Sequence, residues 1–363
     1  MIKFLDIKHQ YNELADRLDA ATKAVFDDGL YIGGDYLSEF EEKFANYVGA
    51  DHCVGAGNGL DALSLLLKAA DLPVGSKVII PNNTFIATAL AVVNEGLQLV
   101  LSDVDKQTRN MSVKTIERVW SDDISAVIFV HLYGSPAGIS DVRRFCEEKN
   151  VLLIEDCAQC HGAEIDGTRV GANGNCAWSF YPGKNLGAIG DGGAITSNDR
   201  ELANNVRALG NYGSFRKYEH SLLGVNSRLD PLQAAILTIK LSKLDEWNNR
   251  RRKIAQKYLA EIENVEISLP RVFENCESAW HLFVVEVKDR EGFQEFLKAG
   301  GIQTSVHYPS TIVKQECFAD IAINYDDLSC SQEMADKIVS LPMGPHLSLD
   351  DADRVIETIN NWR

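Results

Sequence analysis

The sequence predicts an α/β protein with a large domain, built on a mostly parallel seven-stranded sheet flanked by helices, and a smaller C-terminal α+β domain. Two observations lead to this prediction. Over about the first 250 of the 363 residues, short apolar runs alternate with helical patterns. The runs are nearly continuous in Val, Ile and Leu, which is typical of parallel strands covered by helices on both faces. In such sheets ligands bind at the carboxyl ends of the strands.

The elements of the large domain follow this pattern in order. We expect strands at residues 52–57, 77–81, 97–102, 125–131 and 151–155. We expect helices at about residues 60–70, 87–95 and 140–148. The alternation of strand and helix is the pattern of a parallel sheet.

A helical region with a well-marked start follows. Asp230 is a suitable N-cap, Pro231 fits the first helical position, and Gln233 can close a capping box. A long charged helical stretch then continues from about residue 237 to residue 261.

The last third of the chain has a different pattern. Its strand-like runs are shorter, as at residues 279–285, and two amphipathic helices accompany them. We therefore expect a large domain at residues 1–245, which includes an N-terminal helical segment, and a small domain at residues 246–363.

The composition is that of an ordinary globular protein, with 45% hydrophobic residues and a formal net charge of −16. Such an acidic chain is not expected to bind nucleic acid or an anionic membrane. The N-terminus lacks the apolar core of a signal peptide, and no run of 18 apolar residues occurs. We therefore expect a cytoplasmic protein whose eight cysteines are reduced.

The segment IEDCAQCHGA, residues 154–163, contains the spacing Cys157-x-x-Cys160-His161. This spacing occurs at c-type haem attachment sites, and C-x-x-C alone occurs at redox and zinc sites. Covalent haem would normally accompany an export signal, and zinc would need a second close Cys/His pair. We expect no metal here, and two small, half-buried thiols near a strand end are the favoured interpretation.

A carboxylate and a lysine are more informative than the cysteines. Asp156 ends a predicted buried strand, which points its carboxylate toward the ligand crevice, although a capping or surface Asp also fits. Lys184 is the single lysine of the loop at residues 179–195, and four glycines follow it there. A reachable, desolvated lysine suits Schiff-base chemistry, although a surface lysine is the commoner kind.

A glycine-rich turn, Gly55-Ala-Gly-Asn-Gly-Leu60, joins a predicted strand to a helix. Backbone N–H groups at a helix start suit a phosphate. The spacing differs from the dinucleotide fingerprint G-x-G-x-x-G, which disfavours a nicotinamide-dependent oxidoreductase. A phosphate, an aldehyde for lysine and a basic ring nitrogen for a carboxylate occur together in pyridoxal 5′-phosphate (PLP), the cofactor we expect. Phe85 is a candidate to stack on its ring, and an ordinary core aromatic is the alternative.

The whole chain resembles the DegT/DnrJ/EryC1 family of sugar aminotransferases, which are fold-type-I PLP enzymes. The strings that carry the resemblance include residues 57–63, 81–88, 155–162, 179–193, 224–235 and 307–309. The string Glu155-Asp-Cys-Ala-Gln-Cys-His-Gly162 and the lysine loop are the most specific. Cys157 and Cys160 occupy variable positions of that string, which explains the haem-like spacing.

The resemblance implies roles in catalysis and at the ring of the cofactor. Lys184 would hold the cofactor and move the proton during amino transfer. Asp156 would pair with the pyridine nitrogen. Gln159 would lie near the ring face or its 3′-oxygen, although a place behind the ring-contacting residues also fits.

The resemblance also implies how the phosphate is held. Ser179 and the amides of Gly59 and Leu60 would bind it. Asn226 would reach it from the neighbouring subunit of an obligatory homodimer, although an ordinary loop turn also fits Asn226. The family often has Thr or Ser at position 60, so one side-chain contact is expected to be missing.

Within the family, the sequence looks closest to enzymes that aminate C3 of a dTDP-linked 3-keto-6-deoxyhexose, with L-glutamate as the expected donor. The diphosphate would be held by Lys217 and Arg250, and the hexose by Tyr181, His307 and Tyr308. A solvated helix face for Arg250 and packing between domains for the His-Tyr pair are the alternatives. Residues 310–315 lack a proline and a histidine usual in the family, which leaves the sugar open.

Other functions differ in how well they fit. Amination at C4 of a GDP-, UDP- or dTDP-linked sugar remains open. A PLP/PMP-dependent sugar dehydratase usually has His in place of Lys184. A non-catalytic regulatory protein would be favoured by loss of Asp156 or Lys184, and both are present. The family's usual setting is glycan (O-antigen) or antibiotic sugar assembly.

Overall fold

In the computed structural model, which describes residues 1–363, eight strands form one central sheet in the order β1-β9-β8-β5-β4-β2-β3-β14. Strand β9 runs antiparallel to both of its neighbours, and the other pairs are parallel. The mostly parallel seven-stranded sheet is confirmed, and the two-residue β14 adds an eighth strand at one edge. The strands are β1 (His52–Ala56), β2 (Lys77–Pro81), β3 (Gln98–Ser102), β4 (Ile124–Val130), β5 (Leu152–Asp156), β8 (Asn175–Ser179), β9 (Gly193–Ser197) and β14 (Asn324–Tyr325).

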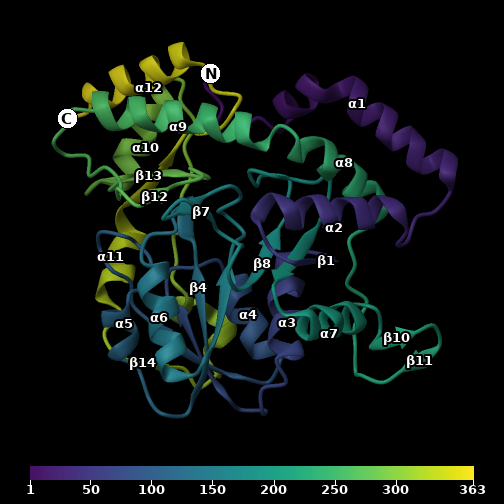
Figure 1. Ribbon diagram of the computed structural model, residues 1–363. Helices are drawn as coiled ribbons and strands as arrows, with labels where there is room; N and C mark the ends of the chain where they lie inside the picture. The colour runs from purple at the N-terminus through teal and green to yellow at the C-terminus, as the bar shows by residue number, and fades with distance from the viewer.

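Helices cover both faces of this sheet (Figure 1). Alternate strand residues point to opposite faces, so Val78 and Ile80 pack in one buried cluster and Ile79 packs in another. The first cluster lies under α3, α4 and α7, and the second lies under α6. The flanking helices are α2 (Asp35–Val48), α3 (Gly59–Ala69), α4 (Ile86–Asn94), α5 (Val113–Glu117), α6 (Ile139–Lys149), α7 (Arg200–Gly210) and α8 (Pro231–Leu241).

The helical stretch expected at residues 237–261 is two helices, α8 and α9 (Leu244–Glu261). At the break, the N–H of Lys243 donates to the carbonyl of Lys240, three residues back. Because of the break, α8 packs on α2 and on α1 (Ile7–Asp28), whereas α9 continues over the C-terminal part (Figure 1).

The predicted capping box at the start of α8 does not form. The side chain of Asp230 makes no cap hydrogen bond. The Gln233 Oε1 instead accepts from the N–H of Ile189, at 2.9 Å, in the loop that carries Lys184. The residue expected to cap its own helix therefore makes a tertiary contact.

The C-terminal part has its own buried cluster. Strands β13 (Phe283–Glu286) and β15 (Ile338–Leu341) pair antiparallel, and α10 (Arg290–Ala299), α12 (Leu349–Asn360) and one face of α9 pack with them. The strand begins at Phe283 rather than at residue 279, because the N–H groups of Ala279 and Leu282 donate to the turn at residues 133–134. The proposed domain boundary at residue 245 stays a prediction.

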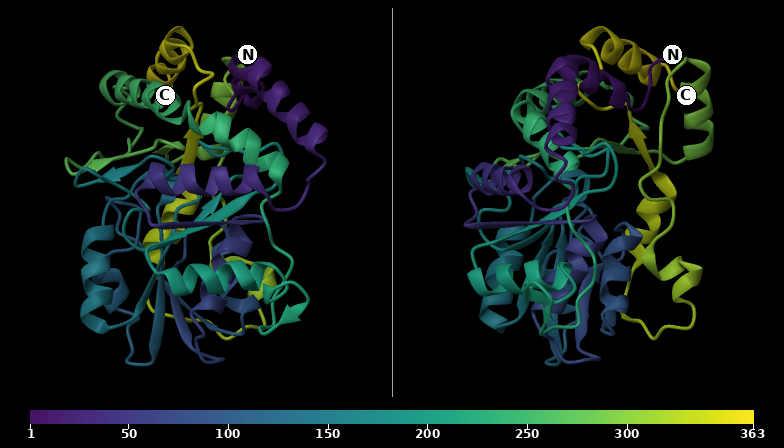
Figure 2. Two further views of the ribbon diagram at one scale, coloured as in Figure 1. Left: turned by 45° about the vertical axis from the view of Figure 1, so that its right-hand side comes forward. Right: turned by 90° about the vertical axis from the view of Figure 1, so that its right-hand side faces the viewer.

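Two segments connect the C-terminal part to the rest of the molecule. Residues 303–337, with α11 (Ser329–Lys337), descend along the large sheet, where β14 pairs with β3 (Figure 2). A small sheet of β6 (Glu164–Ile165), β7 (Thr168–Arg169) and β12 (Cys276–Glu277) joins the two parts. The hairpin β10 (Ser214–Arg216) and β11 (Glu219–His220) projects from the body (Figure 1). None of the helices is both long and apolar enough to cross a membrane.

Candidate active site

Asp156 is the last residue of β5 and lies at the carboxyl edge of the sheet, where it is 7% exposed. Its Oδ2 accepts from the Thr88 hydroxyl at 3.0 Å, and its Oδ1 accepts from the N–H of Ala158 at 3.2 Å. The Thr84 hydroxyl lies 2.8 Å from that of Thr88. Burial raises the pKa of Asp156, and the two donors and the nearby Lys184 oppose this rise. The carboxylate is therefore oriented for a cationic partner.

Lys184 lies in the loop after β8, partly buried and within electrostatic reach of Asp156. Burial lowers its pKa to about 8, although the Asp156 carboxylate opposes this shift. A larger share of the amine is thus neutral near pH 7 than for an ordinary lysine. A neutral amine is the form that attacks an aldehyde.

The loop that carries Lys184 is fixed from α8. Besides the contact of Gln233 with the N–H of Ile189, the Lys240 ammonium donates to the carbonyl of Gly187 at 2.6 Å. Lys240 is 3% exposed and has no carboxylate partner, so burial lowers its pKa to about 8. A buried lysine is thus used to hold a loop carbonyl.

The start of α3 packs directly on the end of β8. A Cβ at Gly59 would lie 2.7 Å from the Cβ of Ser179, which is closer than real Cβ contacts. The Asn58 side chain caps the helix through the N–H of Asp61, at 2.9 Å. The N–H groups of Gly59 and Leu60, at the first helical positions, are left for another acceptor. These amides and the Ser179 hydroxyl fit a phosphate, whereas the Leu60 side chain packs on the core.

A cycle of contacts surrounds Gln159. The backbone N–H of Tyr133 donates to Gln159 Oε1 at 2.7 Å, and Gln159 Nε2 donates to the Tyr308 hydroxyl at 3.0 Å. The Tyr133 hydroxyl donates to the carbonyl of His307 at 2.5 Å. The Tyr308 ring lies 5.4 Å from that of Phe85, which is 53% exposed. Gln159 therefore fixes an aromatic wall beside the Lys184 site.

Two histidines near Lys184 are held neutral. Burial and the Lys184 charge lower the pKa of His307 to about 4, and its Nδ1 lies 2.8 Å from the Ser340 hydroxyl. The same two causes lower the pKa of His161 to about 3. Near pH 7 neither ring adds positive charge beside the amine.

The cysteines of the haem-like spacing are fully buried rather than half-buried, because they pack in the cluster under α2 and α8. Cys157, Cys160 and His131 present ligand atoms within 4.8 Å of one another. Burial raises the pKa of both thiols, which disfavours the thiolate form that a metal requires. The ring of His131 is already engaged by Glu155, at 2.8 Å.

Four of the predicted residues lie apart from this group or open to solvent. Tyr181 is 60% exposed, close to Ser179. Asn226 is exposed, and Lys217 lies at the turn of the projecting hairpin with its ammonium over the Tyr218 ring. Arg250 pairs with Glu13 and with Glu246. The structure does not bring Lys217, Arg250 or Asn226 to Lys184 within one chain, and their roles stay predictions.

Sequence reasoning assigned no role to Thr88, Tyr133 or Lys240. Thr88 lies four residues after Thr84, near the start of the helix that follows β2. A place just after a parallel strand, as for Asp156, is the only sequence signal that could have indicated its role. Tyr133 adopts a left-handed backbone conformation with a φ of 61°. Nothing in the residues around Tyr133 or Lys240 indicates their contacts, which come from distant segments.

Comparison with known proteins agrees with this geometry. Over 363 residues, the chain is 46% identical to dTDP-3-amino-3,6-dideoxy-α-D-galactopyranose transaminase from Aneurinibacillus thermoaerophilus, covering 100% of this chain and 99% of that one. It is 40% identical to dTDP-3-amino-3,4,6-trideoxy-α-D-glucose transaminase from Streptomyces venezuelae, over 99% of this chain and 96% of that one. The crystal structure of S. venezuelae DesV in complex with a ketimine intermediate superimposes with a TM-score of 0.97 at 40% identity, over 99% and 98% of the two chains.

A lysine and a buried carboxylate at the carboxyl edge of this sheet, beside a helix start free to bind phosphate, define a PLP-dependent enzyme. Residues 12–360 match the DegT/DnrJ/EryC1/StrS aminotransferase family, and the chain belongs to it. It is a PLP-dependent sugar aminotransferase, and the two transaminases above are named for dTDP-linked sugars.

Proposed function

We propose that this protein aminates the C3 keto group of a dTDP-linked 3-keto-6-deoxyhexose, with L-glutamate as the amino donor. The chemistry is supported by the Lys184 amine, whose pKa burial lowers to about 8 and which lies within electrostatic reach of the Asp156 carboxylate. The regiochemistry is supported by the two transaminases reported above, whose names both specify a 3-amino dTDP-sugar.

PLP, when bound, supplies the electron sink and carries the amino group between donor and sugar. Asp156, oriented by Thr88, would keep the ring nitrogen protonated. Ser179 and the amides of Gly59 and Leu60 would hold the phosphate, and Phe85 would contact the ring.

Lys184 holds the cofactor in the resting protein and moves the proton at the reacting carbon during transfer. Burial favours its neutral form, which can accept that proton. A dehydratase of this fold, with His at this position, would not have this base.

The sugar is assigned to the side of the site bounded by Tyr181, His307 and Tyr308. The neutral His307 ring, tied through Nδ1 to Ser340, offers its Nε2 to a sugar hydroxyl. Lys217 and Arg250 remain the candidates for the diphosphate. Arg250 would first have to leave its two carboxylates.

The unusual segment at residues 310–315 is anchored on the large domain. The N–H groups of Ile312 and Val313 donate to the carbonyl and the side chain of Asn82, and Ile312 belongs to the core cluster. These contacts hold the segment that departs from the family pattern. We keep C3 amination as our proposal.

A homodimer would complete the site. The hairpin and the segment after it expose large apolar side chains, with Tyr218 84% exposed and Leu223 89% exposed. The neighbour of Asn226, Ser227, accepts from the N–H of Gly57 in the phosphate turn. Following the family resemblance, we assign Asn226 to the cofactor phosphate of the partner subunit.

Hybrid dimers test this arrangement. Lys184→Ala and Asn226→Asp proteins would each be inactive alone. Refolded together, they would recover about a quarter of wild-type activity, because half of the dimers are hybrids with one intact site. No recovery in verified hybrids would mean that Asn226 serves the active site of its own chain rather than that of its partner.

The substrate is tested by running the sugar half-reaction backwards. The yellow PLP-loaded protein is mixed with a dTDP-3-amino-3,6-dideoxyhexose, its 4-amino isomer, or the UDP-linked 3-amino sugar, and the visible band of the bound cofactor is followed. Fast bleaching by the dTDP-linked 3-amino sugar alone supports the proposal. Bleaching by the 4-amino sugar alone would overturn the regiochemistry.

Two controls complete the experiment. L-Glutamate, L-glutamine and L-alanine are compared as donors by the same bleaching, and glutamate is expected to be fastest. Lys184→Ala protein should not be bleached by any of these at the wild-type rate. Bleaching by glutamate but by no nucleotide sugar would overturn the proposed substrate class.

A further inference from the structure

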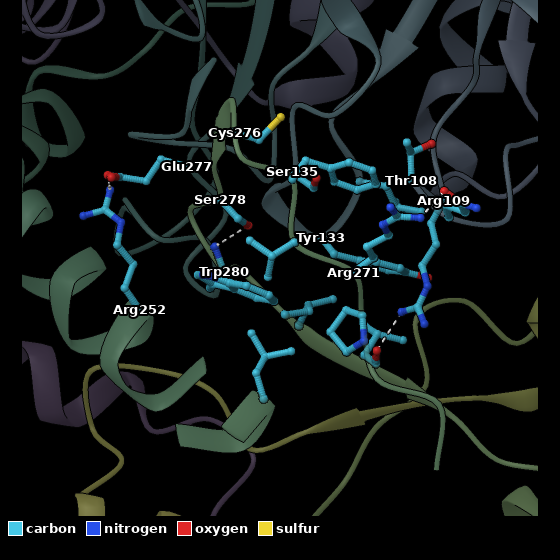
Figure 3. Close-up of a pocket in the computed structure, with 18 of the residues that line it drawn as sticks. Thr108, Arg109, Tyr133, Ser135, Arg252, Arg271, Cys276, Glu277, Ser278 and Trp280 are labelled. Atoms are coloured by element: carbon cyan, nitrogen blue, oxygen red, sulfur yellow. Dashed lines mark hydrogen bonds and ion pairs between the residues drawn. The ribbon is translucent and has the colours of Figure 1, made fainter. Parts of the chain in front are cut away.

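A second cavity lies at the junction of the large sheet and the C-terminal part, with a volume of about 210 Å³. It is lined by residues 107–109, the turn at residues 132–135, one face of α9, and residues 270–284 (Figure 3). Neither Lys184 nor Asp156 belongs to its lining. The cavity is therefore separate from the site described above.

The lining combines apolar and aromatic side chains with one unmatched positive charge. Figure 3 shows Tyr133 and Trp280 in the middle of the lining, between Arg252 and Arg109. Arg252 pairs with Glu277, and Arg109 pairs with Glu286 at 2.9 Å. The third arginine of the lining, Arg271, has no carboxylate partner.

Arg271 donates only to the neutral side chain of Gln107, and its guanidinium lies 5.5 Å from the centre of the Phe273 ring. Arg271 is exposed, and in a chain with a net charge of −16 its guanidinium, which has no carboxylate partner, can attract an anion to the cavity. A guanidinium also stacks well on planar rings. These features together fit a planar aromatic anion.

We propose that this cavity binds an aromatic anion, with the anionic group on Arg271 and the ring against Trp280 and Tyr133, and that the bound ligand acts on the active site through Tyr133. Tyr133 lines the cavity, and its backbone N–H also donates to Gln159. Its hydroxyl donates to the carbonyl of His307. A ligand that moves Tyr133 therefore moves the wall of the Lys184 site.

The backbone of Tyr133 gives this coupling a physical basis. A φ of 61° is uncommon for a residue with a Cβ, so the conformation persists because its contacts hold it. Those contacts lead to Gln159 and, through its amide, to Tyr308. A small shift of Tyr133 thus changes two hydrogen bonds at once.

Binding is tested with phenyl phosphate on the PLP-loaded protein, by calorimetry and by the fluorescence of Trp280. We expect one site per chain, and binding about tenfold weaker for phenol and for inorganic phosphate, which each lack one half of the probe. Trp280→Phe should bind the probe but lose the fluorescence change. No saturable binding of phenyl phosphate at millimolar concentration would overturn the site.

Matched variants locate the probe. Arg271→Ala should weaken binding about tenfold or more, whereas Arg144→Ala, an exposed arginine on α6, should not. Val272→Glu places a like charge at the cavity, on a side chain that is 57% exposed, and should abolish binding. Val265→Glu, at a 94% exposed position outside the lining, is its control. Equal binding by all four variants would overturn the assignment.

The coupling has a separate readout. Phenyl phosphate should shift the visible band of the bound cofactor and change the KM for the amino donor, and both effects should be lost in Arg271→Ala. Binding that leaves the band and the KM unchanged would overturn the coupling through Tyr133. Because the binding arm uses no nucleotide sugar, its failure is distinguishable from failure of the proposed function.

Discussion

Replacing Thr88 by valine tests whether a buried hydroxyl sets the cofactor affinity. Thr88 is fully buried, and its hydroxyl donates to the Asp156 carboxylate at 3.0 Å. Valine has nearly the same shape, so the substitution removes the hydroxyl without opening a cavity. We expect Thr88→Val to fold and to bind PLP more weakly.

The size of the effect follows from the charge of the acceptor. A hydrogen bond to a charged group contributes about 1.5–3 kcal/mol. Since about 1.4 kcal/mol is a tenfold change in affinity, the dissociation constant for PLP should rise roughly 10- to 150-fold. The other donor to Asp156, the N–H of Ala158, lies farther away at 3.2 Å and is not expected to compensate.

The same loss should appear as a pH effect. Burial already raises the pKa of Asp156, and without the hydrogen bond from Thr88, which opposes this rise, the pKa should rise further. PLP binding by Thr88→Val should therefore weaken at a higher pH than in the wild type as the solution is acidified, because the ring nitrogen needs the ionised carboxylate.

The assay is a spectrophotometric titration of the apoprotein with PLP at several pH values, with urea unfolding of the apoprotein in parallel. Thr84→Val removes a hydroxyl one contact farther from Asp156 and should have a smaller effect. Thr238→Val removes a buried hydroxyl that has no partner, and should leave affinity unchanged and stability unchanged or slightly raised.

The reasoning would be refuted if Thr88→Val bound PLP within twofold of the wild type at every pH while its free energy of unfolding fell. In that case the hydroxyl would stabilise the fold rather than the charge of Asp156.

Three further predictions concern the same site. Gly59→Ala places a Cβ 2.7 Å from that of Ser179, so the start of α3 should shift. The PLP affinity, measured in the same titration, should fall about tenfold, and an unchanged affinity would contradict the close contact. Lys240 has a folded pKa of about 8 against 10.5, so the unfolded chain binds more protons between these values and its contribution to stability should rise with pH by about 3 kcal/mol across that window. In urea unfolding Lys240→Met should lose this rise, and exposed Lys23→Met should keep it. Only the neutral form of Lys184 reacts with the cofactor aldehyde. The rate of PLP uptake should therefore rise about tenfold per pH unit below the Lys184 pKa of about 8 and level off above it. A rise that continued to about pH 10 would contradict the lowered pKa.

Much of the large domain could be predicted because its signals are local. Buried parallel strands need continuous apolar runs, and the predicted strand at residues 77–81 is β2 with the same bounds. Asp156 could be placed at the carboxyl edge because it directly follows such a run. Lys184 could be singled out because it is the one lysine in a glycine-rich loop.

Three of the errors share a physical cause, since each involves a residue whose partner is distant in the chain. Residue spacing along a helix cannot reveal such partners, and the capping-box pattern assigns Gln233 to a local cap although its side chain binds the N–H of Ile189. The strand expected from residue 279 starts at Phe283, because the preceding backbone pairs with the turn at residues 133–134. The cysteines of the haem-like spacing are buried by helices that lie far away in the sequence.

The sequence by itself determined the fold class, the cofactor and the pair Lys184 and Asp156, because hydrophobic periodicity and residue chemistry are properties of short segments. The tertiary structure decided what surrounds that pair. Thr88 on Asp156, Lys240 under the lysine loop, and Tyr133 between the site and the second cavity all depend on long-range packing. Burial then sets the pKa of Lys184, because desolvation depends on every segment that excludes water from the amine.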